Sequence, residues 1–238
     1  MRLSLALVTD DLARLRTFYR ELLRTPWFGD ETSVEFRAGM DWVLAITTTA
    51  SLDSHLPGAH VASTNRAVRI ELAVADVDAE YERLRHFGSE IVAPPTDWPW
   101  GTRSTWLRDP DGNLVSLFSV AGSAPGIQGI TIEVADLQRS RRFYDGVLGF
   151  SPGEFYEPTR WQPFEFGNQF FGIREVPGAP RRDREDIVNF AVGDVDAMWL
   201  RVRDAVEVVD PLDRTPWGSY KFVIADPDGF KLGFVAAS

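Results

Sequence analysis

The tetrapeptide Asp-Pro-Asp-Gly occurs twice in this 238-residue chain, at residues 109–112 and 226–229, which are 117 positions apart. Pro-Trp-Gly recurs at the same offset, at residues 99–101 and 216–218. Asp-Leu followed by Phe-Tyr recurs at an offset of 125, at residues 11–19 and 136–144. Such internal repetition constrains the architecture before any single element is assigned. It predicts a duplicated unit.

Hydrophobic periodicity divides each half into two modules. At the start of the chain, residues 3–8 alternate as a strand does, and apolar residues then follow at spacings of three and four, as in a helix with one buried face. That buried stripe is predicted to contain Leu12, Leu15, Phe18, Tyr19 and Leu22. Two further strands are expected at residues 33–37 and 42–48. This order defines a βαβββ module.

The same order begins three more times, with strands at residues 68–74, 130–134 and 187–192. Each strand runs into an aspartate that can cap a helix, namely Asp76, Asp136 and Asp194. Helices are predicted at 77–87, 137–148 and 195–203, and Asp-Pro-Asp-Gly is predicted to turn the last hairpin of the second and fourth modules. The fold class is therefore α+β, with modules at about 1–50, 67–120, 127–178 and 186–238. We expect two tandem domains, 1–120 and 127–238, joined by a Gly-, Ala-, Ser- and Pro-containing linker at 121–126.

Composition excludes several classes of function. A formal net charge of -10 disfavours a nucleic-acid partner, because Lys and Arg supply most of the affinity for phosphates. No apolar run approaches the roughly 18 residues of a membrane span, and the first residues lack the features of a secretory signal. We therefore expect a cytoplasmic protein without a membrane partner. The absence of cysteine excludes disulfides, thiolate metal sites and cysteine nucleophiles.

The repeated motifs resemble those of the vicinal oxygen chelate superfamily, which includes glyoxalase I, extradiol dioxygenases, fosfomycin-resistance enzymes and bleomycin-binding proteins. The resemblance covers essentially the whole chain. It implies that pairs of modules curl their strands into cup-shaped mixed sheets, with helices outside and the ligand within. Single-domain relatives usually pair two chains, so this chain is expected to be a pseudo-dimeric monomer or a homodimer. Fold alone does not decide among the superfamily's chemistries.

The resemblance also implies where a divalent metal would be held, and these positions lack donors. The expected carboxylate four residues beyond each Asp-Pro-Asp-Gly is replaced by Ser116 and Gly233. The first-strand ligand, seven residues before each capping aspartate, is replaced by Ser4, Arg69, Gly129 and Ile187. Because a metal needs three or four converging donors, we predict neither a metal nor another cofactor. His55, His60 and His86 are interpreted as surface residues, although the first two can bind an adventitious metal.

Other polar side chains are expected to face the cups, because residues two apart on a strand share a face. These residues are Ser4, Arg69, Glu71, Thr131, Glu133 and Asn189. The two glutamates have three interpretations: an internal ion pair with an arginine, a ligand-binding role, or a general base with an elevated pKa. Their catalytic role is the weakest of the three.

Eight tryptophans are many for a chain of this length. Aromatic rings beside a concave surface can stack on planar ligands or attract cations. We predict that Trp98, Trp100, Trp106 and Trp217 line the cups together with Ser116, and the alternative for the loop tryptophans is packing of the loop itself.

Three hypotheses of function follow. The first is metal-independent binding of an aromatic or cationic small molecule, which resembles the antibiotic resistance provided by drug-sequestering, bleomycin-type proteins. The second is a metal-dependent lyase or dioxygenase whose ligands are displaced from the usual positions. The third is a metal-free isomerase or cyclase that uses Glu71 or Glu133 as its base. The first favours a protein that is not an enzyme.

Overall fold

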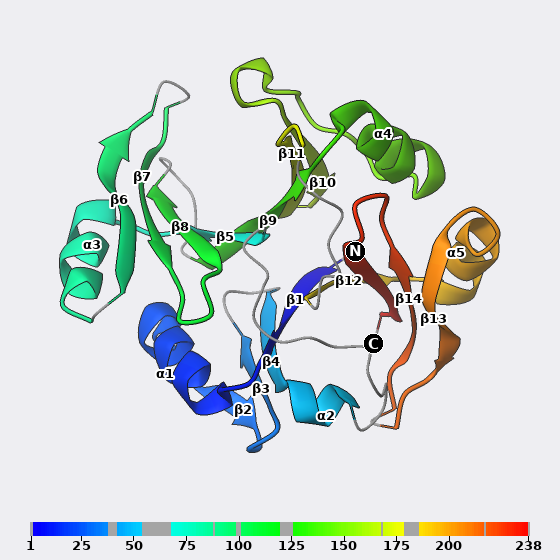
Figure 1. The fold of residues 1–238 in the computed structure, drawn as a ribbon, viewed down its shortest axis with the longest axis horizontal. Coiled ribbons are helices and arrows are strands. Elements are labelled where there is room, and N and C mark those ends of the chain that lie inside the picture. Colours follow the sequence, from blue (N-terminus) through cyan, green and yellow to red (C-terminus); the bar gives the residue numbers. More distant parts are fainter. Residues whose placement is uncertain are drawn as a thin grey trace. The chain divides into compact units, whose positions relative to one another are not determined.

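A computed structural model describes the chain over residues 2–37, 42–53, 68–87, 89–98, 101–119, 126–167, 169–178, 186–216 and 218–237. Figure 1 follows its elements from blue at the N-terminus to red at the C-terminus. Trp100, Trp217, His55, His60 and residues 121–125 of the predicted linker lie outside these ranges. Gly126, the last residue of the predicted linker, is instead the first residue of a strand.

The elements of the first two modules follow the predicted order. The first module contains β1 (Arg2–Thr9), α1 (Leu12–Leu23), β2 (Trp27–Gly29), β3 (Ser33–Arg37), β4 (Val43–Thr48) and the short α2 (Thr49–Asp53). The second contains β5 (Val68–Ala73), α3 (Val77–Arg85), β6 (Glu90–Asp97), β7 (Arg103–Arg108) and β8 (Leu114–Ser119). All five residues of the predicted stripe on α1 are buried.

The second half repeats this order, except that among its described residues the third module has two strands after the helix, and Pro152 forms only an isolated bridge with Phe164 where a further strand was predicted. The third module contains β9 (Gly126–Val134), α4 (Leu137–Arg141), the π-helical turn η1 (Arg142–Val147), the 3-10 turn η2 (Glu157–Thr159), β10 (Trp161–Phe166) and β11 (Gln169–Glu175). The fourth contains β12 (Ile187–Val192), α5 (Val195–Val202), β13 (Glu207–Arg214), β14 (Tyr220–Ala225) and β15 (Lys231–Ala236). The helix predicted at 137–148 therefore leaves α-helical geometry after Arg141, because η1 widens its last turns.

The strands form two mixed sheets, which confirms the α+β class. One sheet has the order β13-β14-β15-β12-β1-β4-β3-β2, and the other has the order β10-β11-β9-β5-β8-β7-β6. In both, the first strand of a module runs parallel to its last strand, as β5 does with β8 and β12 with β15. Within the described ranges, no helix combines the length and the hydropathy needed to cross a membrane.

Contacts divide the chain into two compact units. The N-terminal unit is Val8–Thr131, and the C-terminal unit is Met1–Leu7 together with Ile132–Ser238. The chain thus passes between units inside β9, and the first strand belongs with the C-terminal unit because β1 pairs with β12 from Arg2↔Ala191 to Ala6↔Ile187. The domains 1–120 and 127–238 remain a prediction from the repeat.

The two repeated motifs are joined by a hydrogen bond in each unit. In the N-terminal unit the Tyr19 hydroxyl of Phe-Tyr donates to the Asp109 carboxylate of Asp-Pro-Asp-Gly, at 2.8 Å. In the C-terminal unit the Tyr144 hydroxyl donates to Asp226, also at 2.8 Å. Both tyrosines are fully buried, and both aspartates are nearly so. The motifs therefore recur together because each pair fastens a helix to a hairpin turn.

Candidate functional site

Sheet register places three predicted site residues in one row across the N-terminal unit. Trp106 on β7 lies opposite Ser116 on β8, and Ser116 lies opposite Glu71 on β5. Directly opposed residues share a face of a sheet. The alternation on β5, where Val68, Ile70 and Leu72 are buried, places Arg69 on the same face as Glu71.

Arg69 and Glu71 form an ion pair on this face. The exposed fractions of their side chains are 18% and 9%, so water screens the pair little. The Thr131 hydroxyl, which is also buried, donates to the Glu71 carboxylate at 3.5 Å. The Glu71 carboxylate thus has a cationic partner and a hydroxyl partner. Of the three interpretations of this glutamate, the contacts agree with the internal ion pair.

The guanidinium of Arg69 also stacks on an indole ring. Its Cζ lies 5.0 Å from the ring centroid of Trp106, which is cation–π geometry. The Trp106 indole N–H donates to the Ser104 hydroxyl oxygen at 3.0 Å, and the Trp98 indole N–H donates to the same oxygen at 2.8 Å. Ser104 is only 3% exposed, so one buried oxygen fixes the orientation of two half-buried indoles.

We call Arg69, Glu71, Trp98, Ser104 and Trp106 the Arg69 cluster. It combines one flat cation that already has a counter-ion with two aromatic rings held in place by hydrogen bonds. Arg69, Glu71, Trp98 and Trp106 were predicted from sequence, whereas Ser104 was not. The alternation of a strand could have revealed Ser104, because it precedes Trp106 by two residues on the same strand and therefore shares its face.

The second predicted glutamate lies in the C-terminal unit. Glu133 forms a hydrogen-bonded ion pair with Arg174 of β11, and their side chains are 31% and 36% exposed. Arg174 lies opposite Trp161 in the β10–β11 register. Arg174 was not predicted, because nothing in the sequence links it to a glutamate that precedes it by 41 residues.

Asn189 occupies the corresponding face of the C-terminal unit. It lies opposite Ser4 of β1 and opposite Gly233 of β15. A Cβ atom placed on Gly233 would lie 2.1 Å from the Asn189 Oδ1 atom, so the amide fills the space beside the glycine. That Oδ1 atom is buried and has no hydrogen-bond partner among the described residues.

Lys221 is a further ionisable group that the sequence did not reveal as unusual. Burial lowers its pKa, and the nearby Asp210 opposes that effect. Its position on β14 lies two residues from Val223, which is opposite Gly233. Lys221 therefore shares the face that carries Asn189.

The fold agrees with the comparisons to known proteins. A sequence model of the Glyoxalase/Bleomycin resistance protein/Dioxygenase superfamily matches residues 3–117 and 126–234. The chain therefore belongs to this superfamily, with one match in each half. No curated protein matches the sequence.

Solved structures show the same fold at low sequence identity. Glyoxalase I from Zea mays is 18% identical with a TM-score of 0.76, over 99% of this chain and 92% of that chain. A putative dioxygenase from Bacillus subtilis is 12% identical with a TM-score of 0.67, over 98% of this chain and 84% of that one. At these identities the likeness extends to the fold and no further.

The residues at the family's metal positions do not fit a divalent cation. Arg69 occupies a ligand position with a positively charged group, and Asn189 fills the space that a longer side chain at Gly233 would need. Ser116 supplies one neutral hydroxyl where a carboxylate is expected. Among the described residues, no three His, Asp or Glu side chains are placed to share a metal ion.

Proposed function

We propose that this protein binds a planar aromatic small molecule without a metal, and that the ligand stacks at the Arg69 cluster. The observation that carries the proposal is the cation–π contact between Arg69 and Trp106 at a position where the family places a metal ligand. A flat guanidinium and two oriented indoles favour flat ligands, and each aromatic contact contributes about 0.5–1.5 kcal/mol beyond area burial.

The charge of the cluster favours an aromatic ligand over a cationic one. The cationic alternative rests on carboxylates facing the cups, yet Glu71 is paired with Arg69 and Glu133 with Arg174. A cation would have to compete with a guanidinium for either carboxylate. A neutral or weakly charged planar molecule meets no such competition, and sequestration of such a compound is the function we infer.

Isothermal titration calorimetry against a panel of planar aromatic compounds tests this function. We expect binding in the micromolar range, weakened about three- to tenfold by Trp106→Leu. Trp199→Leu is the matched control, because this half-buried tryptophan packs on Phe222 of the C-terminal unit. Absence of binding by every compound at high micromolar concentration would contradict the proposal.

Metal analysis of the same preparation separates binding from metal-dependent chemistry. We expect substoichiometric Fe, Mn, Ni and Zn, and ligand binding that is unchanged by a chelator. A stoichiometric divalent metal whose removal abolishes ligand binding would overturn the metal-independent proposal in favour of a displaced-ligand lyase or dioxygenase.

A further inference from the structure

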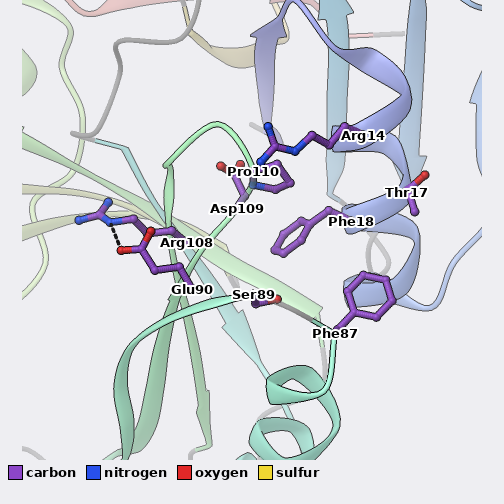
Figure 2. A pocket seen from close by; sticks show the side chains of 9 residues that line it. All are labelled: Arg14, Thr17, Phe18, Phe87, Ser89, Glu90, Arg108, Asp109 and Pro110. Carbon is purple, nitrogen blue, oxygen red and sulfur yellow. Dashed lines mark ion pairs between the residues drawn. The ribbon is translucent and has the colours of Figure 1, made fainter.

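The N-terminal unit has a hollow of about 450 Å³ that is separate from the Arg69 cluster. Three segments line it, as Figure 2 shows: α1, the connection from α3 to β6, and the end of β7 with its turn. The lining residues are Arg14, Thr17, Phe18, Phe87, Ser89, Glu90, Arg108, Asp109 and Pro110. Its volume lies within the range of roughly 300–1,000 Å³ that is usual for small-molecule sites.

Two phenylalanine rings supply the apolar part of this hollow. Phe18 is buried on α1, whereas Phe87 is 44% exposed, which is unusual for a phenylalanine. Figure 2 shows the rings of Phe18 and Phe87 on the same side of the hollow. A ligand ring placed against them would remove the Phe87 ring from water, and burial of apolar surface stabilises a complex.

Two of the charged side chains around the hollow, those of Arg108 and Asp109, already have several partners within the protein. Arg108 pairs with Glu90 at 3.7 Å and donates to the Gly112 carbonyl at 2.7 Å. Asp109 accepts hydrogen bonds from the Tyr19 hydroxyl, from Asn113 and from the Asp111 N–H. Arg14 forms no ion pair with the other lining residues. Burial raises the pKa of the nearby Asp111 carboxylate and the Arg14 charge opposes that effect, so a ligand acid would share this guanidinium with Asp111.

A hydroxyl lies across the hollow from this cation. The Ser89 Oγ atom is buried and has no hydrogen-bond partner among the described residues. Buried polar atoms are nearly always hydrogen-bonded, so a ligand or a water molecule is needed to satisfy it. In Figure 2 the Phe18 ring lies between Arg14 and Ser89.

From this arrangement we infer that the hollow is a binding site for a small aromatic carboxylate. The acid group pairs with the Arg14 guanidinium, the ring packs on Phe18 and Phe87, and a polar substituent at the far end meets the Ser89 hydroxyl. A guanidinium binds a carboxylate through two parallel hydrogen bonds, which explains the preference for an acid. The site is independent of the function proposed for the Arg69 cluster.

Calorimetric titration of the full chain with 4-hydroxycinnamate tests the assignment. We expect about a tenfold weaker affinity for Arg14→Gln, since a hydrogen bond to a charged group contributes about 1.5–3 kcal/mol, and a weaker affinity for Phe87→Ser. Arg14→Lys should lose less, because it keeps the charge. Arg20→Gln is the control on the same helix, because Arg20 is exposed and pairs with Glu21.

Two further measurements identify the ligand group that is recognised and the site at which the ligand binds. The uncharged amide of 4-hydroxycinnamate should bind at least tenfold more weakly, and Trp106→Leu should leave binding of 4-hydroxycinnamate unchanged. Equal affinity of the acid and the amide, equal affinity of wild type and Arg14→Gln, or absence of binding at about 10 mM would each overturn the assignment. Loss of affinity in Trp106→Leu alone would move this ligand to the Arg69 cluster.

Discussion

At the scale of single residues, the paired hydrogen bonds from Tyr19 to Asp109 and from Tyr144 to Asp226 are the strongest test of how the repeat is stabilised. Tyr19→Phe or Tyr144→Phe leaves a buried carboxylate with one donor fewer. We expect each to lower the free energy of unfolding by about 1.5–3 kcal/mol, measured by urea denaturation.

Tyr220→Phe is the matched control for these two variants. The Tyr220 hydroxyl donates to Asp196 at the same distance, 2.8 Å, but at an exposed site. Water replaces such a bond, so a change within about 0.5 kcal/mol is expected. An equal loss of stability in the buried and the exposed variants would show that burial of the carboxylate is not the cause.

Asp226 makes stability depend on pH. Burial raises its pKa from 3.8 to about 6, although hydrogen bonds from Phe230 and Tyr144 oppose the effect. Because the folded pKa is the higher one, the folded state binds the proton more tightly, and the unfolded state releases it first as the pH rises. The stability that protonated Asp226 contributes is therefore complete below about pH 4 and is lost as the pH rises through about 6.

Asp226→Asn tests this dependence, because an amide can still accept from the Asp228 and Phe230 N–H groups. We expect the difference in unfolding free energy between variant and wild type to change by on the order of 1–3 kcal/mol between pH 4 and pH 7. The variant should be relatively more stable at the higher pH. A difference that is constant over this range would contradict a raised pKa.

At the scale of elements, four helices begin in the same way. The carboxylates of Asp11, Asp76, Asp136 and Asp194 each accept the backbone N–H three residues later, at 2.8–3.0 Å. Asp76→Ala or Asp194→Ala should lower the unfolding free energy by about 0.5–2 kcal/mol, whereas Asn should preserve most of it. Thermal unfolding followed by circular dichroism measures both, and equal effects of Ala and Asn would exclude capping as the cause.

Local signals explain why these elements could be predicted. The spacing of Leu12, Leu15, Phe18, Tyr19 and Leu22 is a property of one helix, and all five are buried. Positive φ angles at Gly112 (91°) and Gly229 (84°) close the hairpins, as Asp-Pro-Asp-Gly indicates. The transition of α4 into a π-helical turn has no comparable local signal.

Contacts between distant segments account for what could not be predicted at the candidate site. The sequence placed Arg69, Glu71 and Thr131 on one face, yet the stacking of Arg69 on Trp106 depends on how β5, β8 and β7 are aligned. The hollow beside Phe87 escaped prediction for the same reason, since its lining comes from three segments. Periodicity predicts the face of a strand but not its neighbours.

At the scale of the whole molecule, the first strand of the chain supplies part of the sheet of the C-terminal unit. Leu5 and Leu7 of β1 are 1% and 0% exposed, and β1 pairs with β12 of the C-terminal unit. A fragment of residues 127–238 lacks this strand and exposes the edge of β12. We expect it to aggregate or remain unfolded, as measured by size-exclusion chromatography and circular dichroism.

The comparison fragment carries residues 1–9 fused by a flexible linker after residue 238. It restores the β1–β12 pairing and should be more soluble and more cooperative in unfolding than the fragment without it. If both fragments behave alike, β1 is not needed to complete the C-terminal unit.

The position of β12 also brings the two chain ends within reach of each other. Arg2 and Val235 both lie opposite Ala191, on either side of β12, so they are separated by about two strand spacings, or roughly 10 Å. About five Gly and Ser residues can bridge such a gap. A circular permutant can be joined there and opened within residues 121–126. In this permutant each compact unit would be an almost continuous stretch of sequence. If such a permutant folds, the order in which the four modules are encoded is not a requirement of the fold.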